Sequence, residues 1–144
     1  MTALGQSWLV WALLAAVFAA LTAIFAKVGV SDIGADYATF LRTLVVAAAL
    51  FVILAATGQF EPLSSVSPKS LTFLVLSGLA TGASWVCYFR ALKLGQASSV
   101  APVDKLSVVL VTVFGTLFLG EHLSGSAWVG VVLIGVGAVM VATG

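Results

Sequence analysis

An acidic and a basic side chain stand next to each other in an otherwise apolar stretch. Asp104 and Lys105 lie in the segment APVDKLS (residues 101–107), at the start of a long apolar run. Ionised side chains are costly inside membrane-spanning helices, where they mark binding sites and proton or ion pathways. Lys105 is long enough to reach toward the membrane surface, whereas Asp104 needs a partner at its own depth. We expect that partner to be Arg42, Arg90 or Lys105.

Two roles fit Asp104. It can belong to a structural ion pair that holds three helices together, or it can act in substrate binding or proton coupling. Ser107 continues the face of Asp104 along the same helix and would accompany it in either role.

A stripe of polar side chains follows one face of the preceding apolar segment. Ser77, Thr81, Ser84 and Tyr88 recur at helical spacing, and Trp85 lies at the edge of the stripe. The hydroxyls, with the nearby G-x-x-x-G at residues 78–82, can serve helix packing. Alternatively, the stripe and its aromatic side chains line a cavity. On that second interpretation the expected substrate-binding residues are Thr81, Ser84, Trp85, Tyr88, Asp104, Lys105 and Ser107, with Arg42, Arg90 and Asp104 as ion-pairing or gating residues.

The composition is that of an integral membrane protein. Of 144 residues, 62% are hydrophobic and 8% are charged, and the mean hydropathy is +1.23. Soluble domains carry about 25% charged residues, so this chain lacks the polar surface that water requires. Its formal net charge of +1 offers no basic patch for nucleic acid.

The reactive residue types are scarce. A single cysteine, Cys87, excludes an intrachain disulfide, and a single histidine, His122, is too little for a metal site. No nucleophile and base stand at a recognisable spacing. We therefore expect no catalytic site, no metal and no cofactor.

Five apolar segments are long enough to span a bilayer, which needs about 20 residues each. They predict an all-α bundle in one domain, residues 1–144, because the linkers between them are short. The predicted spans are residues 8–26, 38–57, 70–90, 98–119 and 126–143. Pro102 in the fourth span predicts a mild kink next to Asp104.

The six Lys and Arg residues are unevenly distributed between the two sides of such a bundle. Lys69 stands alone on one side, and the others share the opposite side: Lys27, Arg42, Arg90, Lys93 and Lys105. Lys and Arg are enriched in short loops on the cytoplasmic side of a membrane. We expect the N-terminus outside and the C-terminus in the cytoplasm.

Three segments resemble a known family. They are SGLATGASWVCYFRAL at residues 77–92, APVDKLS at residues 101–107 and FLGEHL at residues 118–123. Together they resemble the EamA-type repeat of the drug/metabolite transporter superfamily, and in particular its small five-span bacterial and archaeal family. The likeness covers about residues 8–141. The small multidrug-resistance branch relies on a glutamate in its first span, and the first span here has none, so that mechanism does not carry over.

The resemblance implies a secondary transporter in the inner membrane, with export of a small organic metabolite or drug-like compound as the expected activity. Ten-span members of the superfamily hold two inverted repeats around the substrate cavity, whereas this chain holds one. A complete pathway then needs a second subunit. We expect a homodimer contacting through Ser126, Gly130 and Gly137, with a heterodimer with a related subunit as the alternative and the relative orientation open. A non-transporting accessory subunit of a membrane complex is the alternative function.

Overall fold

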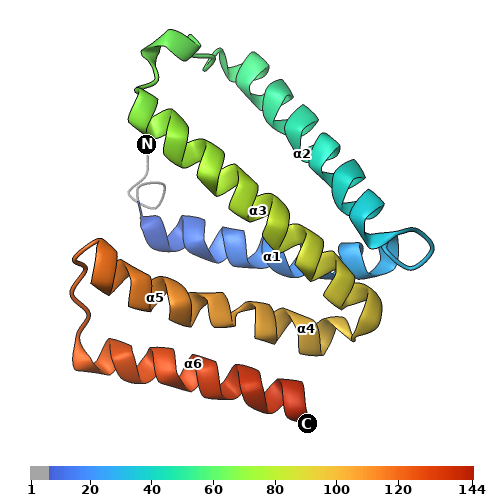
Figure 1. Cartoon of the computed structure of the whole chain (residues 1–144), viewed down its shortest axis with the longest axis vertical. Helices are drawn as coiled ribbons and strands as arrows, with labels where there is room; N and C mark the ends of the chain where they lie inside the picture. Colours follow the sequence, from blue (N-terminus) through green and yellow to red (C-terminus); the bar gives the residue numbers. More distant parts are fainter. Residues whose placement is uncertain (1–6) are drawn as a thin grey trace. The chain divides into compact units, whose positions relative to one another are not determined.

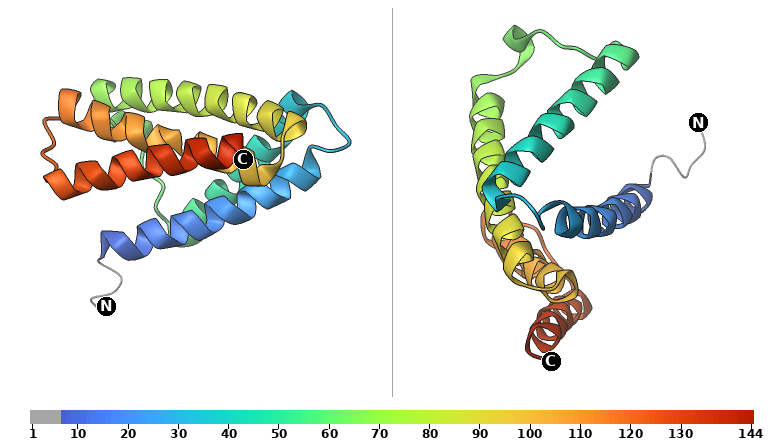
Figure 2. Two further views of the ribbon diagram at one scale, coloured as in Figure 1. Left: turned by 90° about the horizontal axis from the view of Figure 1, so that it is seen from below. Right: turned by 90° about the vertical axis from the view of Figure 1, so that its right-hand side faces the viewer.

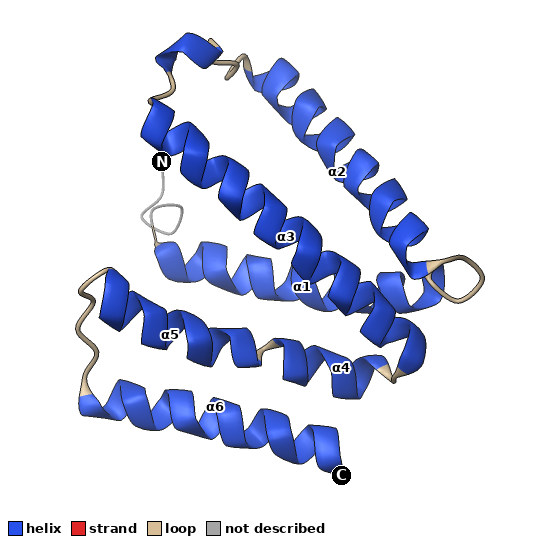
Figure 3. Ribbon diagram, viewed as in Figure 1, coloured by secondary structure: helices blue, strands red, loops and turns tan. Residues whose placement is uncertain are grey.

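The computed structural model describes residues 7–144, and this part of the chain consists of helices and loops without strands (Figure 3). In chain order the elements are α1 (Trp8–Gly29), α2 (Ala35–Thr57), the short 3-10 helix η2 (Leu63–Ser65), α3 (Pro68–Leu94), α4 (Ala97–Asp104), α5 (Leu106–Phe118) and α6 (Gly125–Thr143). With α4 and α5 counted as one span, the described residues contain 5 helices long and apolar enough to cross a membrane. The all-α five-span fold class is confirmed.

Several helices extend past the predicted apolar windows. The largest extension is at the C-terminal end of α3, which continues through Arg90 and Lys93 to Leu94. A hydropathy window ends where charged residues begin, but the backbone hydrogen bonds of a helix continue into the polar interface. The charged residues at this end therefore stand on helix rather than in a loop.

The helix surfaces carry large apolar side chains that remain exposed in the chain by itself. Leu79 is 67% exposed, Val111 68% and Phe18 65%. Exposed apolar area on this scale does not occur on soluble monomers, where it would drive association. Lipid or another subunit must cover it.

The chain divides into two compact units. The terminal unit combines α1 up to Lys27 with Leu94–Gly144, and the central unit is Val28–Lys93. In the terminal unit, α6 runs back along α4 and α5 (Figure 1). Gly135 on α6 faces α5, since a Cβ there would be in ordinary contact with the Val109 side chain at 3.5 Å.

The fourth span is discontinuous, in line with the kink predicted at Asp104. Helix α4 ends at Asp104 and α5 begins at Leu106, with Lys105 between them at φ −71° and ψ −6°. The N–H of Lys105 donates to the carbonyls of both Ala101 and Pro102, at 3.2 and 3.1 Å. Pro102 lacks an N–H, so the Ser98 carbonyl loses its regular donor one turn before this break. After the break, the Lys105 carbonyl accepts from the N–H of Val108 at 2.9 Å.

The central unit consists of α2, η2 and α3. Figure 2 (right) shows α2 and α3 lying closest where α2 begins and diverging toward η2. The buried residues of this unit all lie near the start of α2 or the end of α3: Val30, Ala38, Thr39, Phe89 and Leu92. Helix α2 ends at Gly58, whose φ of 65° is left-handed and whose N–H caps the Leu54 carbonyl.

The FLGEHL segment begins at the last residue of α5 and continues into the loop before α6. The N–H groups of Leu119 and Glu121 both donate to the Gly115 carbonyl, at 3.1 and 3.2 Å. Gly120 between them has a φ of 68°, which a glycine adopts without strain. This part of the motif therefore has a structural role in turning the chain toward α6.

Candidate functional site

The central unit places a guanidinium on an indole ring within its membrane-spanning helices. The Cζ atom of Arg42, on α2, lies 3.3 Å from the ring centroid of Trp85, on α3. At roughly 1.5 Å per residue, Arg42 lies about 10 Å from the start of α2 and Trp85 about 14 Å from the end of α3. The stacking therefore keeps the charged group at membrane depth instead of letting it extend to the surface.

Two further aromatic rings surround Trp85. The Tyr88 ring lies 5.7 Å from it, edge to face, and the Phe89 ring lies 5.9 Å from it. The three residues stand at i, i+3 and i+4 of one helix, which is the spacing that brings side chains together on one face. Phe89 is buried, while Trp85 and Tyr88 are partly exposed. The cluster thus joins an apolar base to an accessible polar edge.

A bidentate ion pair joins the two helices of the central unit. Arg90 donates through Nε to Asp36 Oδ1 at 2.8 Å and through Nη2 to Oδ2 at 2.7 Å. Both side chains are more than half exposed in the chain by itself. One turn away, Lys93 Nζ donates to the carbonyl of Ile33, in the loop before α2. These contacts connect the start of α2 to the end of α3.

In the terminal unit, Asp104 forms an ion pair with its neighbour Lys105. Lys105 Nζ lies 3.3 Å from Asp104 Oδ2, and the Asp104 side chain is 35% exposed. Of the three partners expected for Asp104, the structure thus pairs it with Lys105, while Arg90 binds Asp36. In the same unit, Lys27 Nζ donates to the Gly95 carbonyl at 2.7 Å.

The remaining predicted site residues differ in how their hydroxyls are used. Thr81 donates to the Ser77 carbonyl one turn back, at 2.8 Å, so part of the polar stripe satisfies its own helix. Ser84 and Ser107 are exposed on their helices. Thr81, Ser84, Trp85 and Tyr88 therefore share one helix, whereas Asp104, Lys105 and Ser107 lie at the break between α4 and α5.

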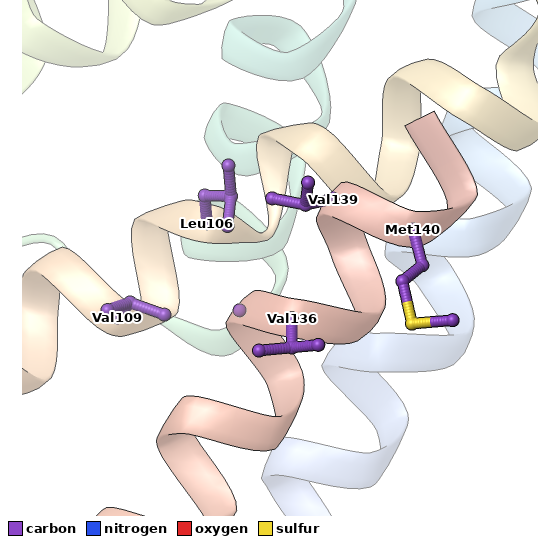
Figure 4. Close-up of a pocket in the computed structure, with 6 residues that line it drawn as sticks. Leu106, Val109, Val136, Val139 and Met140 are labelled. Carbon is purple, nitrogen blue, oxygen red and sulfur yellow. The ribbon is translucent and has the colours of Figure 1, made fainter. Parts of the chain in front are cut away.

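A hollow on the terminal unit has an entirely apolar lining. Its residues come from α5 and α6: Leu106, Val109, Gly135, Val136, Val139 and Met140 (Figure 4). Binding of polar molecules needs a few well-placed hydrogen-bonding side chains among the apolar ones. This hollow offers none, and it suits a lipid chain or an apolar side chain.

Sequence reasoning missed Asp36 as the partner of Arg90. The sequence contained a signal for this ion pair, since Asp36 lies near the start of the second span and Arg90 at the end of the third. Consecutive spans run in opposite directions, so both residues stand at the same membrane face with opposite charges. An ion pair between them could have been proposed from that arrangement.

Comparison with known proteins decides the family. The EamA-like transporter family matches residues 6–143 of the chain. The chain belongs to this family. It is also 57% identical, over 139 residues, to a protein of Sinorhizobium sp. described as an uncharacterized transporter in the cobO 3′ region; the match covers 96% of this chain and 99% of that protein. No solved structure matches the chain. It is thus an EamA-like, multi-pass membrane protein.

The Asp36–Arg90 pair of this EamA-like protein can be tested by charge exchange. We expect Asp36→Arg and Arg90→Asp each to lower the melting temperature of the purified protein, because each places two like charges in contact. The double variant should recover most of the loss, since the pair is restored in reverse. Asp32→Asn is the control, because Asp32 accepts only from the hydroxyl of its neighbour Ser31. Additive losses in the double variant would contradict a direct interaction.

Proposed function

We propose that this EamA-like protein is a secondary transporter that exports a small organic metabolite or drug-like compound across the inner membrane, as a dimer of five-span subunits. The observation that carries the proposal is the Arg42 guanidinium stacked on Trp85 at 3.3 Å inside the spans. A charge kept in a membrane at such cost marks a functional site. The family supports transport as that function.

The discontinuous fourth span supports the same proposal. Many transporters build their sites from interrupted helices, because the freed backbone groups and nearby charges can bind substrates and coupling ions. Asp104 and Lys105 stand at the break between α4 and α5. We assign Asp104 to proton or ion coupling, with Lys105 and Ser107 beside it, and the aromatic cluster around Trp85 to the substrate.

The accessory-subunit alternative rests on the ion pairs. Asp36–Arg90 could serve only to hold α2 and α3 together, and Asp104–Lys105 only to neutralise two neighbouring charges within one span. Arg42 argues against that alternative, because charged residues inside spans usually pair with one another or with backbone carbonyls, whereas Arg42 lies on an aromatic ring. Transport is therefore the stronger proposal.

A dimer interface on α6 follows from helix geometry. With about 100° of rotation per residue, Gly130 and Gly137 share one face of α6, roughly opposite Gly135, and Ser126 lies within about 40° of them. Gly135 approaches Val109, whereas a Cβ at Gly130 or Gly137 would meet no atom within 4 Å. Small residues on an outward helix face suit close contact with another helix in a membrane. We propose this face for the second subunit, with a homodimer preferred to a heterodimer with a related chain.

The coupling role of Asp104 is tested by Asp104→Asn. The purified protein is first screened against small organic compounds, since a ligand that binds the native state raises the melting temperature. For a compound found this way, we expect Asp104→Asn to fold and to lose at least about tenfold in flux into or out of proteoliposomes, the effect of losing one charged contact. Glu61→Gln, in the loop before η2, is the control. Full flux with a lowered melting temperature would assign Asp104 to structure alone.

The orientation follows from the Lys and Arg distribution, with the C-terminus in the cytoplasm. Fusions to the C-terminus test it. We expect a reporter that folds only in the cytoplasm to be active and a periplasmic reporter to be silent. The reverse pattern would contradict the orientation, and activity of both would indicate that copies insert in both directions.

The α6 interface is tested by crosslinking in native membranes. In a Cys87→Ser background, Gly130→Cys should form a disulfide-linked dimer under mild oxidation, because both copies present this position to each other. Gly135→Cys is the matched control and should remain monomeric, since that position packs toward α5. Equal crosslinking at the two positions, or none together with a monomeric mass in mild detergent, would remove the α6 dimer.

A further inference from the structure

The hydrogen-bond donors of Arg42 have no role in the contacts of the central unit described so far. A guanidinium carries its N–H groups in one plane, and stacking on Trp85 covers a face of that plane rather than its edge. The N–H groups at the edge stay available, and they are arranged as a fork that fits two oxygens of one anion. In the central unit this fork holds no carboxylate.

The acidic side chains of the unit are accounted for elsewhere. Both oxygens of Asp36 accept from Arg90, and Asp32 accepts from the Ser31 hydroxyl. Glu61 follows the opposite end of α2, more than about 20 Å along the helix from Arg42. The unit therefore keeps a positive charge at the Trp85 cluster that none of its own acids neutralises.

We propose that Arg42, held in place by Trp85, binds the anionic group of a small aromatic organic anion, such as a ring bearing a carboxylate or sulfonate. This inference rests on the transporter function proposed above and names its substrate class. The anion would take the edge of the guanidinium in a bidentate contact. Among the groups of the central unit, Arg42 has no carboxylate partner, so the bound substrate would supply its counter-ion.

The aromatic part of the ligand follows from the surroundings of the guanidinium. Trp85 covers one face of Arg42, and the Tyr88 and Phe89 rings stand 5.7 and 5.9 Å from Trp85. Planar rings stack on guanidinium faces and on aromatic edges. A planar ligand can therefore contact the open face of Arg42 or the neighbouring rings, whereas a flexible aliphatic acid would gain less from the same surface.

Three phenyl compounds of similar size test the inference, differing mainly in charge. They are benzenesulfonate, which is anionic, benzenesulfonamide, which is neutral, and phenyltrimethylammonium, which is cationic. We expect benzenesulfonate to raise the melting temperature of the purified protein and the other two to leave it unchanged. Preference for the cation would overturn the inference, because Trp85 would then be a cation site that Arg42 occupies in its absence.

Substitutions test which residues bind benzenesulfonate. Arg42→Gln should weaken benzenesulfonate binding about tenfold or more, and Arg42→Lys should weaken it less, since a lysine keeps the charge and loses the fork. Lys69→Gln removes a cation from the first turn of α3 and should change nothing. A protein in which Trp8, Trp11 and Trp128 are replaced by Phe reports binding through the fluorescence of Trp85 alone. Unchanged affinity in Arg42→Gln, with the fold retained, would overturn the inference.

A lipid phosphate could offer the same anionic oxygens. Titration in nanodiscs of phosphatidylcholine alone and of phosphatidylcholine with phosphatidylglycerol separates the two sources. Equal affinity in both supports a soluble anion, whereas loss of binding with phosphatidylglycerol assigns Arg42 to a lipid headgroup and contradicts the proposal. Flux of a neutral or cationic compound that depends on Asp104, without benzenesulfonate binding, would reject the anion and leave transport standing. Benzenesulfonate binding without any flux would support the anion site and reject the transport function.

Discussion

The main constraint on this structure is the free-energy cost of placing charged side chains in the hydrocarbon of a membrane. An ionised side chain in a membrane needs an opposite charge, a carbonyl or a polarisable ring beside it. Asp104 and Lys105 pair as neighbours at a helix break, and Asp36 and Arg90 form a bidentate pair where α2 and α3 reach the membrane face. Lys27 and Lys93 reach backbone carbonyls at loops instead. Arg42 differs from these basic residues, because its partner is an indole ring.

The same constraint explains the backbone. Without water, the peptide groups must bond within their own segment, so long helices joined by short loops are the expected solution. Interruptions are tolerated only where something replaces the lost bonds. At Lys105 the N–H shares two carbonyls, and at the end of α5 two N–H groups share the Gly115 carbonyl. The first interruption coincides with the Asp104–Lys105 pair, and this coincidence links the local backbone to the proposed coupling role.

The fold could be read from the sequence because its signals are local. Apolar windows and the breaks between them predict five spans, and Pro102 predicts the irregularity at Asp104. Spacing along one helix likewise brings Trp85, Tyr88 and the polar stripe together. The contacts between helices could not be derived in this way. Whether Arg42 meets Trp85 depends on the rotation of α2 and α3 about their axes and on their crossing, which no spacing within either helix determines.

For the proposed transporter, we expect the polar stripe and Trp85 to line a water-accessible path rather than a packed helix contact. The most direct test is labelling of single cysteines by a membrane-impermeant thiol reagent, in a Cys87→Ser background. Ser84→Cys lies on the stripe and Leu79→Cys on the opposite side of α3. We expect rapid labelling at position 84 that bound ligand slows, and little labelling at position 79. Equal resistance of both cysteines to the reagent, in a folded protein, would contradict it.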